Sequence, residues 1–287
     1  MDLAAQLVPL GRFGAEVRGI DLGRPLSDAS DGALRALLAR YQILLFRRQI
    51  ITPNDQLRFT RIFGLPEPGL ERRPTDHKLP NHHDILYLSN AAGSATSDYG
   101  LGWHSDGLAY ARVPHGVTVL QCKACPPDSG ATLFANQYAA FDRLGEELQR
   151  TIAGLYWQLP SIPFSEVPAG RGLAQPMVRE HPMTGGRFLF CAPAARQICG
   201  WSHSDSAELL RSIHAHQTHA DCLYRHDWVP GDVLIWENRT LLHTRAGKVD
   251  PVTQGLRVMH RTATLGDFEA VACEAAEPEV PPNARQA

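Results

Sequence analysis

The stretch GLAYARVPHGVTVLQCKACPPDSGATLFANQ (residues 107–137) contains three short apolar segments, separated by proline, glycine and other turn residues. Apolar segments of this length between turn residues are typical of strands. We therefore predict strands at 107–113, 116–123 and 131–137. A run of short strands with few helices between them favours a barrel or a jelly roll.

Similar segments lie on both sides of this stretch, with strands predicted at 41–49, 84–90, 187–192, 222–228, 232–238 and 255–265. One helix is predicted to start after a Thr52 cap, with Pro53 in its first position and Gly64 at its end. Two more helices are predicted at 137–155 and 204–219. A parallel α/β fold would need strands and helices to alternate, and here they do not. The pattern predicts a mainly β protein with inserted helices, folded as a barrel or a two-sheet jelly roll.

The composition of the 287 residues is that of an ordinary globular protein, with 44% hydrophobic residues and a net charge of −2. No basic excess indicates binding to nucleic acid or to an anionic membrane. No apolar run approaches the roughly 20 residues of a membrane helix, and we expect no signal peptide. The six cysteines do not suggest a disulfide framework, and the CKAC pair at 122–125 fits a strand end, so we expect a cytoplasmic protein.

We predict one domain over residues 1–274 because no repeat, linker or shift in composition divides the chain. The acidic, proline-rich segment 275–287 is expected to be a flexible tail. The irregular segment 65–100 and the stretch 161–175 are candidate lids over a binding site.

The triplet His-Ser-Asp occurs twice, and the context of each copy separates the two. His203–Asp205 lies at the start of a predicted helix, where Ser204 or Asp205 can cap the free amides of the first turn. On a helix, side chains two residues apart diverge, so this copy does not suit a shared metal. His104–Asp106 instead lies between a glycine-rich loop and a strand, where side chains two apart point to one side.

A third ligand is expected from His243, which follows the apolar strand at 232–238. Two imidazoles and one carboxylate form the facial triad of non-haem Fe(II) oxygenases, which leaves positions open for a co-substrate and oxygen. Zinc would accept similar ligands. Downstream, Arg257 and Arg261 share one face of the last strand with Met259. Buried guanidinium groups need anions and pair with carboxylates through two hydrogen bonds, and Thr132 could add a hydroxyl.

The order of several motifs resembles the taurine dioxygenase (TauD/TfdA-like) family of Fe(II)/2-oxoglutarate-dependent oxygenases. These motifs are FTRIFG, WHSDG, SGATLFAN, REHPMTGGRFLF, ICGWSHSDSAELLRSIHAH, DWVPGDVLIWENRTLLH and RVMHRTATLGD, and they span most of the chain. The fold implied by the resemblance is the double-stranded β-helix, a cupin-like jelly roll. The resemblance also implies roles for six residues: iron ligands His104, Asp106 and His243, 2-oxoglutarate contacts Thr132 and Arg257, and the substrate-anion contact Arg261.

The activity implied is oxidation of an unactivated C–H bond in a small, anionic substrate (a carboxylate, sulfonate or amino-acid-like molecule). The reaction would need Fe(II) as a cofactor and would consume 2-oxoglutarate and O2, with succinate and CO2 as co-products. The same residues could support desaturation, cyclisation or oxidative decarboxylation. Asp106 argues against halogenation, because halogenating relatives keep that position small. Taurine itself is not expected, because FGLPEPGL (63–70) lacks a histidine and Gly100 replaces an asparagine of the taurine enzyme.

Two alternatives stay open, a cupin-like metal-binding sensor without turnover and a zinc hydrolase. A sensor would have no need of Arg257 and Thr132. The substrate pocket is expected to draw on side chains from several loops, with candidates Tyr99, Leu108, Tyr110, Phe164 and Arg171. As in many relatives, a homodimer or homotetramer is expected.

Overall fold

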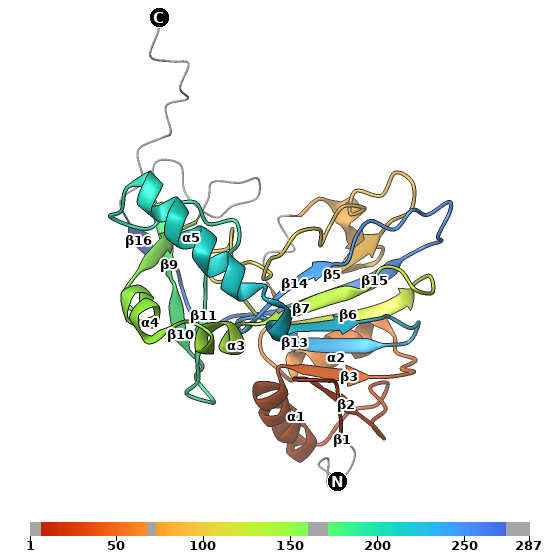
Figure 1. Cartoon of the computed structure of the whole chain (residues 1–287). Coiled ribbons are helices and arrows are strands. Elements are labelled where there is room, and N and C mark those ends of the chain that lie inside the picture. Colours follow the sequence, from red (N-terminus) through yellow and green to blue (C-terminus); the bar gives the residue numbers. More distant parts are fainter. Residues whose placement is uncertain (1–6, 68–72, 160–171, 274–287) are drawn as a thin grey trace, which may run out of the picture.

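The computed structural model describes residues 7–67, 73–159 and 172–273 (Figure 1). Its largest element is an eight-stranded sheet in which all neighbours are antiparallel except the parallel pair β2–β3. The strand order is β1 (Leu7–Pro9), β2 (Ala15–Val17), β3 (Ile43–Phe46), β13 (Val233–Glu237), β6 (His115–Ala124), β15 (Val258–Leu265), β5 (His82–Ser89) and β4 (Lys78–Leu79). A smaller antiparallel sheet contains β12 (Leu223–His226), β7 (Thr132–Asn136) and β14 (Leu241–Arg245).

The central strands of the large sheet are apolar at successive positions, so that side chains on both faces are buried. In β13, Val233 and Ile235 belong to one buried cluster, which includes residues of helices α1 (Asp28–Tyr41) and α2 (Pro53–Arg61). Leu234 and Trp236 point the other way, into a second cluster shared with the small sheet. There the rings of Trp236 and Phe134 meet edge to face at 5.4 Å. The two sheets thus form a jelly-roll sandwich, which confirms the predicted fold class.

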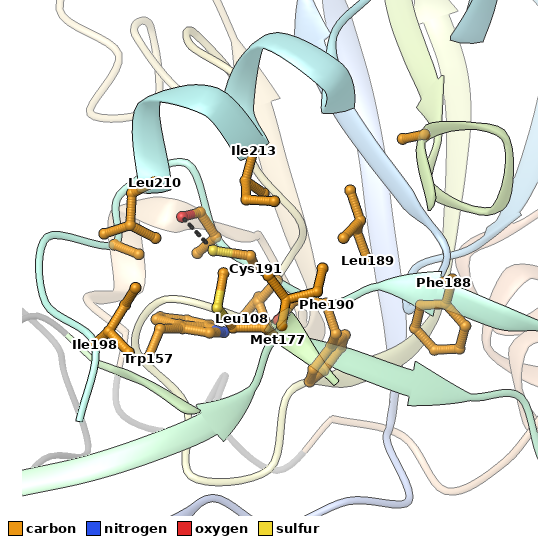
Figure 2. Close-up of a cluster of buried hydrophobic side chains, with 14 of the residues drawn as sticks. Leu108, Trp157, Met177, Phe188, Leu189, Phe190, Cys191, Ile198, Leu210 and Ile213 are labelled. Carbon is orange, nitrogen blue, oxygen red and sulfur yellow. Dashed lines mark hydrogen bonds between the residues drawn. The ribbon is translucent and has the colours of Figure 1, made fainter. Parts of the chain in front are cut away.

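A second group of elements, here called the helical lobe, lies to the left of the sandwich in Figure 1. It contains α3 (Gln137–Asp142), α4 (Glu146–Ile152), α5 (His203–Gln217), the strand pair β10 (Val178–Glu180) and β11 (Arg187–Leu189), and the three-stranded sheet β16 (Val271–Cys273), β9 (Gly172–Pro176) and β8 (Tyr156–Gln158). Figure 2 shows its core, where Trp157, Met177, Phe190 and Ile213 pack together from four separate segments. The indole of Trp157 donates to the carbonyl of Phe190 at 2.7 Å. Two short 3-10 helices complete the described chain, η3 (Thr75–His77) and η4 (Ala220–Cys222).

Most predicted elements are confirmed, but three local predictions are wrong. The helix predicted at 137–155 is two helices, because Gly145 begins α4 as an N-cap residue. The cap of α5 is Ser202, whose hydroxyl accepts from the amide of Asp205 at 3.1 Å, so neither Ser204 nor Asp205 is the cap residue. By contrast, Thr52 and Asp55 form the capping box at the start of α2, with Pro53 in the first turn as predicted.

The third error concerns residues 107–113, which form turns and not a strand. Gly107 adopts a φ of +78°, and a Cβ at this position would lie 3.0 Å from the amide of His115. This tight turn directs Leu108 into the core of the helical lobe (Figure 2). The turn therefore ties the loop that carries Asp106 to a second hydrophobic core.

The two candidate lids contain more regular structure than predicted. In the described part of 65–100, η3, β4 and β5 precede a turn-rich segment. Most of 161–175 lies outside the described residues, and 172–175 belong to strand β9. The predicted tail at 275–287 also lies outside them. Within the described chain, no helix combines the length and apolarity needed to cross a bilayer.

Candidate active site

Backbone pairing brings two of the predicted ligands together. His243 is the middle residue of β14, and His104 forms an isolated antiparallel bridge with it. The amide of His104 donates to the carbonyl of His243 at 3.0 Å, and the reverse bond is 2.7 Å. The imidazole rings consequently lie side by side, with their centroids 4.2 Å apart.

Asn238 fixes the backbone of the third candidate ligand. Its amide oxygen accepts from the amide of Asp106 at 2.9 Å, and its amide nitrogen donates to the carbonyls of Asp106 and His115. Asn238 is fully buried at the turn between β13 and β14. One side chain thus joins the loop of Asp106 to the strand pair that carries His243.

The two oxygens of the Asp106 carboxylate have different neighbours. Its Oδ2 accepts from the hydroxyl of Thr118 at 2.8 Å and from Nε of Arg261 at 3.1 Å. Its Oδ1 lies 3.8 Å from Nε2 of His104 and 3.9 Å from Nε2 of His243. Candidate ligand atoms of these three residues all lie within 4.8 Å of one another. One metal ion can therefore be reached by all three side chains.

The protonation of these groups suits a metal. Nδ1 of His104 lies 2.8 Å from the carbonyl of Gly102, so Nδ1 is the donor and Nε2 is the ring nitrogen left for a metal. Burial and the nearby His104 lower the pKa of His243 to about 3, so its imidazole is neutral near pH 7. Burial alone would raise the pKa of Asp106, but Arg261 and the histidines hold it far below its usual value. Two neutral imidazoles and a carboxylate are the donor set of a non-haem Fe(II) centre.

A cavity of about 260 Å³ adjoins these three side chains. Its apolar wall consists of Leu86, Leu88, Leu120 and Trp236. Its cations are Arg73, Arg245, Arg257 and Arg261, and its hydroxyls come from Tyr99, Tyr110 and Thr132. A pocket with an apolar wall and several cations suits small organic anions.

Thr132 and Arg257 form one end of this cavity. The Thr132 hydroxyl accepts a hydrogen bond from the indole N–H of Trp228 at 2.9 Å, so its own proton can be donated into the cavity. Nε of Arg257 donates to the carbonyl of Gly130 at 3.0 Å. Gly130 has a φ of +69°, and a Cβ there would lie 2.8 Å from Cδ of Arg257. Glycine therefore permits the close approach that aims the guanidinium.

Arg257 carries a charge that the described residues do not neutralise. Arg257 is 4% exposed, and its guanidinium has no carboxylate within ion-pair distance among the described residues. Burial, with a smaller contribution from nearby Arg245, lowers the pKa of Arg257 to about 10. The guanidinium stays protonated near pH 7, so this end of the cavity attracts a carboxylate.

Arg261 also lines the cavity, but its nitrogens are occupied. Besides the bond to Asp106, Nη1 lies 3.3 Å from Oε2 of Glu67, and Nη2 lies 2.8 Å from Nδ1 of His115. Nε2 of His115 lies 2.8 Å from Oε1 of the same glutamate. Burial alone would raise the pKa of Glu67, but His115 and Arg261 lower it to about 2. Two ionised carboxylates thus share the charge of Arg261.

The remaining sequence candidates divide into three groups. Tyr99 and Tyr110 line the cavity. Leu108 lies in the core of the helical lobe and not among the described side chains around the cavity. Phe164 and Arg171 lie outside the described residues.

The sequence analysis missed Arg73 and Arg245. Arg245 had a signal, because it lies two residues after His243 on one strand and so shares its face. Its Nη1 donates to the carbonyl of Ser97 at 2.8 Å. Arg73 lies in an irregular segment, where no periodicity indicates the direction of a side chain.

Comparison with known proteins places the chain in a family. Residues 5–263 match the model of the taurine catabolism dioxygenase TauD, TfdA family. The chain belongs to this family. It is 30% identical to the alpha-ketoglutarate-dependent 2,4-dichlorophenoxyacetate dioxygenase of Cupriavidus pinatubonensis, with 92% of this chain and 98% of the relative covered. It is 28% identical to the alpha-ketoglutarate-dependent sulfate ester dioxygenase of Pseudomonas putida, over 90% and 88% of the two chains.

Solved structures of the TauD/TfdA family share the fold. A taurine dioxygenase from Burkholderia xenovorans superposes with a TM-score of 0.80 at 28% identity, over 94% of this chain and 96% of that one. AAD-2 in complex with Mn(II) and N-oxalylglycine gives 0.79 at 25% identity, over 92% and 99%. The protein is therefore a non-haem iron oxidoreductase, a dioxygenase that uses Fe(II), 2-oxoglutarate and O2.

Proposed function

We propose that this dioxygenase oxidises an unactivated C–H bond of a small organic anion while 2-oxoglutarate is converted to succinate and CO2. The observation that carries the proposal is the convergence of His104, Asp106 and His243 beside a cavity that also contains Arg257 and Thr132. A metal-binding sensor would need the three ligands but no buried, unpaired arginine next to them.

In this proposal His104, Asp106 and His243 hold the iron, which supplies the redox chemistry with O2. The protein's contribution is to orient the ligands. Thr118 and Arg261 hold one oxygen of Asp106, so the other faces the imidazoles. The backbone pairing of His104 with His243 fixes the spacing of the rings. Loss of such an outer contact typically lowers metal affinity or activity by about 10- to 100-fold.

The co-substrate is held at the other end by Arg257 and Thr132. 2-Oxoglutarate carries two carboxylates, and its distal one meets the guanidinium of Arg257 and the hydroxyl proton of Thr132. The interaction is favourable because it supplies the counter-charge that this buried arginine lacks. It also places the keto-acid end toward the iron ligands.

The substrate occupies the rest of the cavity, against Leu86, Leu88 and Trp236. Two relatives are named for the oxidation of phenoxyacetates and sulfate esters, which are anions with apolar bodies. Hydroxylation is the proposed outcome, and a hydroxylated carbon that bears a heteroatom would lose that fragment. Desaturation, cyclisation and oxidative decarboxylation would use the same residues. The cytoplasmic location and the dimer or tetramer stay predictions of the sequence.

The test is succinate formation from 2-oxoglutarate with a panel of small anions, measured with and without Fe(II) and O2. We expect formation to require both, and to be lost in Arg257→Ala but kept in Arg187→Ala, which alters an exposed arginine on β11. Turnover that persists in Arg257→Ala would contradict the assignment. Anaerobic turnover with zinc and without 2-oxoglutarate would instead indicate a hydrolase.

A further inference from the structure

All three guanidinium nitrogens of Arg261 already have partners within the protein, so a substrate anion would have to compete with them. Its guanidinium is held between the carboxylates of Asp106 and Glu67, and the side chains of Arg261 and Glu67 are 6% and 4% exposed. An anion placed against Arg261 would be brought next to two ionised carboxylates. Like charges at such distances in a buried site repel strongly. Arg261 is therefore poorly suited to receive the substrate.

Arg73 is held by hydroxyl groups and not by direct ion pairs with described carboxylates. Its Nη2 donates to the hydroxyl of Tyr110 at 3.0 Å, and its Nη1 donates to the hydroxyl of Tyr99 at 3.4 Å. Its guanidinium carbon lies 5.7 Å from the Tyr110 ring centroid and 5.8 Å from that of Tyr99. No carboxylate of the described chain lies within 4.0 Å of it, although its charge is near enough to Glu67 to contribute to the lowered pKa of that carboxyl. Arg73 is thus a cation that two neutral phenols hold at the cavity wall.

The two tyrosines are themselves anchored. Burial raises the pKa of Tyr110 to about 12, so its hydroxyl is neutral and can donate a proton. Tyr110 follows the Gly107 turn, and its amide donates to the carbonyl of Gly107 at 3.2 Å. The hydroxyl of Tyr99 lies 2.9 Å from Nδ1 of His77. Through Tyr110, Arg73 is thus connected to the turn that follows Asp106. An anion bound to Arg73 is therefore held at a fixed place relative to the metal ligands.

Arg245 is the other arginine of the cavity that sequence analysis missed, and it is less suited to the role. Its Nη1 is held by the carbonyl of Ser97, and its charge acts on Arg257, whose pKa it helps to lower. It therefore belongs to the end of the cavity assigned to 2-oxoglutarate.

We infer that Arg73, flanked by Tyr99 and Tyr110, binds the anionic head of the substrate, and that Arg261 is a positioning residue for Asp106. This inference rests on the proposed function and names the substrate class of that site. The ligand is a small monoanion, a carboxylate or a sulfate ester, whose apolar body lies along Leu86 and Leu88. A guanidinium has five N–H groups, and two are engaged here, so a forked pair with an oxyanion remains available.

The test measures binding without turnover, in the protein loaded with Mn(II) and N-oxalylglycine, an analogue of 2-oxoglutarate. Calorimetry follows three probes: phenoxyacetate, hexyl sulfate and the neutral phenoxyethanol. The variants are Arg73→Gln, Arg73→Lys and Tyr110→Phe, with Arg187→Gln as the control at an exposed arginine. Thermal unfolding of each variant checks that the fold is intact.

We expect Arg73→Gln to weaken binding of at least one anionic probe by about 10- to 100-fold. Arg73→Lys should lose less, because it keeps the charge but not the fork. Tyr110→Phe should weaken the same probe by several-fold, whereas phenoxyethanol and N-oxalylglycine should bind all variants alike. The probe that responds distinguishes a carboxylate substrate from a sulfate ester.

Unchanged anion binding in Arg73→Gln, with N-oxalylglycine still bound, would overturn this inference and leave the proposed function in place. The same holds if no anionic probe binds the wild-type complex. Failure of the wild-type protein to bind Mn(II) and N-oxalylglycine would overturn the proposed function, and this inference with it.

Discussion

Replacing Arg257 by methionine should make the metal-free protein more stable while greatly weakening 2-oxoglutarate binding. Burial, together with Arg245, lowers the pKa of Arg257 well below its ordinary value, to about 10. At about 1.4 kcal/mol for each pKa unit, the buried charge costs the folded state about 3 kcal/mol. The guanidinium is protonated at pH 7 both folded and unfolded, so this cost applies at every pH below about 10. Losing the hydrogen bond to Gly130 removes about 1 kcal/mol, which leaves a net gain of about 2 kcal/mol.

Arg261 lies four residues further along the chain and provides a matched control, because its replacement should lower the free energy of unfolding and not raise it. Burial alone would lower its pKa, but the carboxylates of Asp106 and Glu67 raise it, so its charge is compensated. Arg261→Met would leave both carboxylates buried without their cation, and we expect a loss of about 3–5 kcal/mol.

The assay is urea unfolding at pH 7, followed by tryptophan fluorescence, without metal and then with Mn(II) and 2-oxoglutarate. At a hundredfold excess over its Kd, 2-oxoglutarate should stabilise the wild type by about 2.7 kcal/mol and Arg257→Met hardly at all. The reasoning is refuted if Arg257→Met is destabilised as much as Arg261→Met. It is also refuted if Arg257→Met is still stabilised by 2-oxoglutarate.

Three further variants test single contacts. Trp228→Phe removes the bond to Thr132 and should raise KM for 2-oxoglutarate about fivefold with little change in kcat; an altered kcat alone would argue against it. Gly130→Ala places a Cβ 2.8 Å from Arg257 and should raise the same KM, and an unchanged KM would show that the guanidinium is not aimed by this contact. Burial alone would raise the pKa of Glu237, but its arginine and histidine neighbours lower it to about 2. The ionised Glu237 carboxylate therefore stabilises the folded state above pH 4.5, and this contribution is lost as pH falls toward 2. Glu237→Gln should therefore be about 3 kcal/mol less stable than wild type at pH 7 and about equal near pH 2; a constant difference in urea unfolding across that range would contradict this.

The sequence predicted the fold well where periodicity is strong. The continuous apolar run of β13 was recognisable as a buried strand, and its side chains point alternately to the two faces as extended backbone requires. His104 and Asp106 do meet as predicted, but Asp106 lies at the start of a turn, where Asn238 holds its backbone. The turn at Gly107 was misread as a strand because apolar residues follow it, and only the second hydrophobic core explains why Leu108 is apolar. A linear pattern does not reveal which of two cores a side chain joins.

The pairing of charged side chains in the site could not be predicted from the sequence, for a different reason. Arg261 was predicted to contact the substrate because its position matches the family's pattern, but its pairing depends on Glu67, which lies far from it in the chain. Glu67 stands in the stretch FGLPEPGL, where the absence of a histidine was noticed but the partner of the glutamate was not predictable. Arg73 likewise acquires its position through contacts with Tyr99 and Tyr110. Both cases depend on long-range contacts between loops.

The most direct test of the central claim is an anaerobic titration with Fe(II) in the presence of 2-oxoglutarate, followed by the visible charge-transfer band of the complex. The account predicts that the band saturates at one iron per chain. It should be absent in His104→Ala and His243→Ala, and Arg257→Met should require far more 2-oxoglutarate to develop it. A full band in either histidine variant, or no band in the wild type, would contradict the claim that these side chains form the iron site.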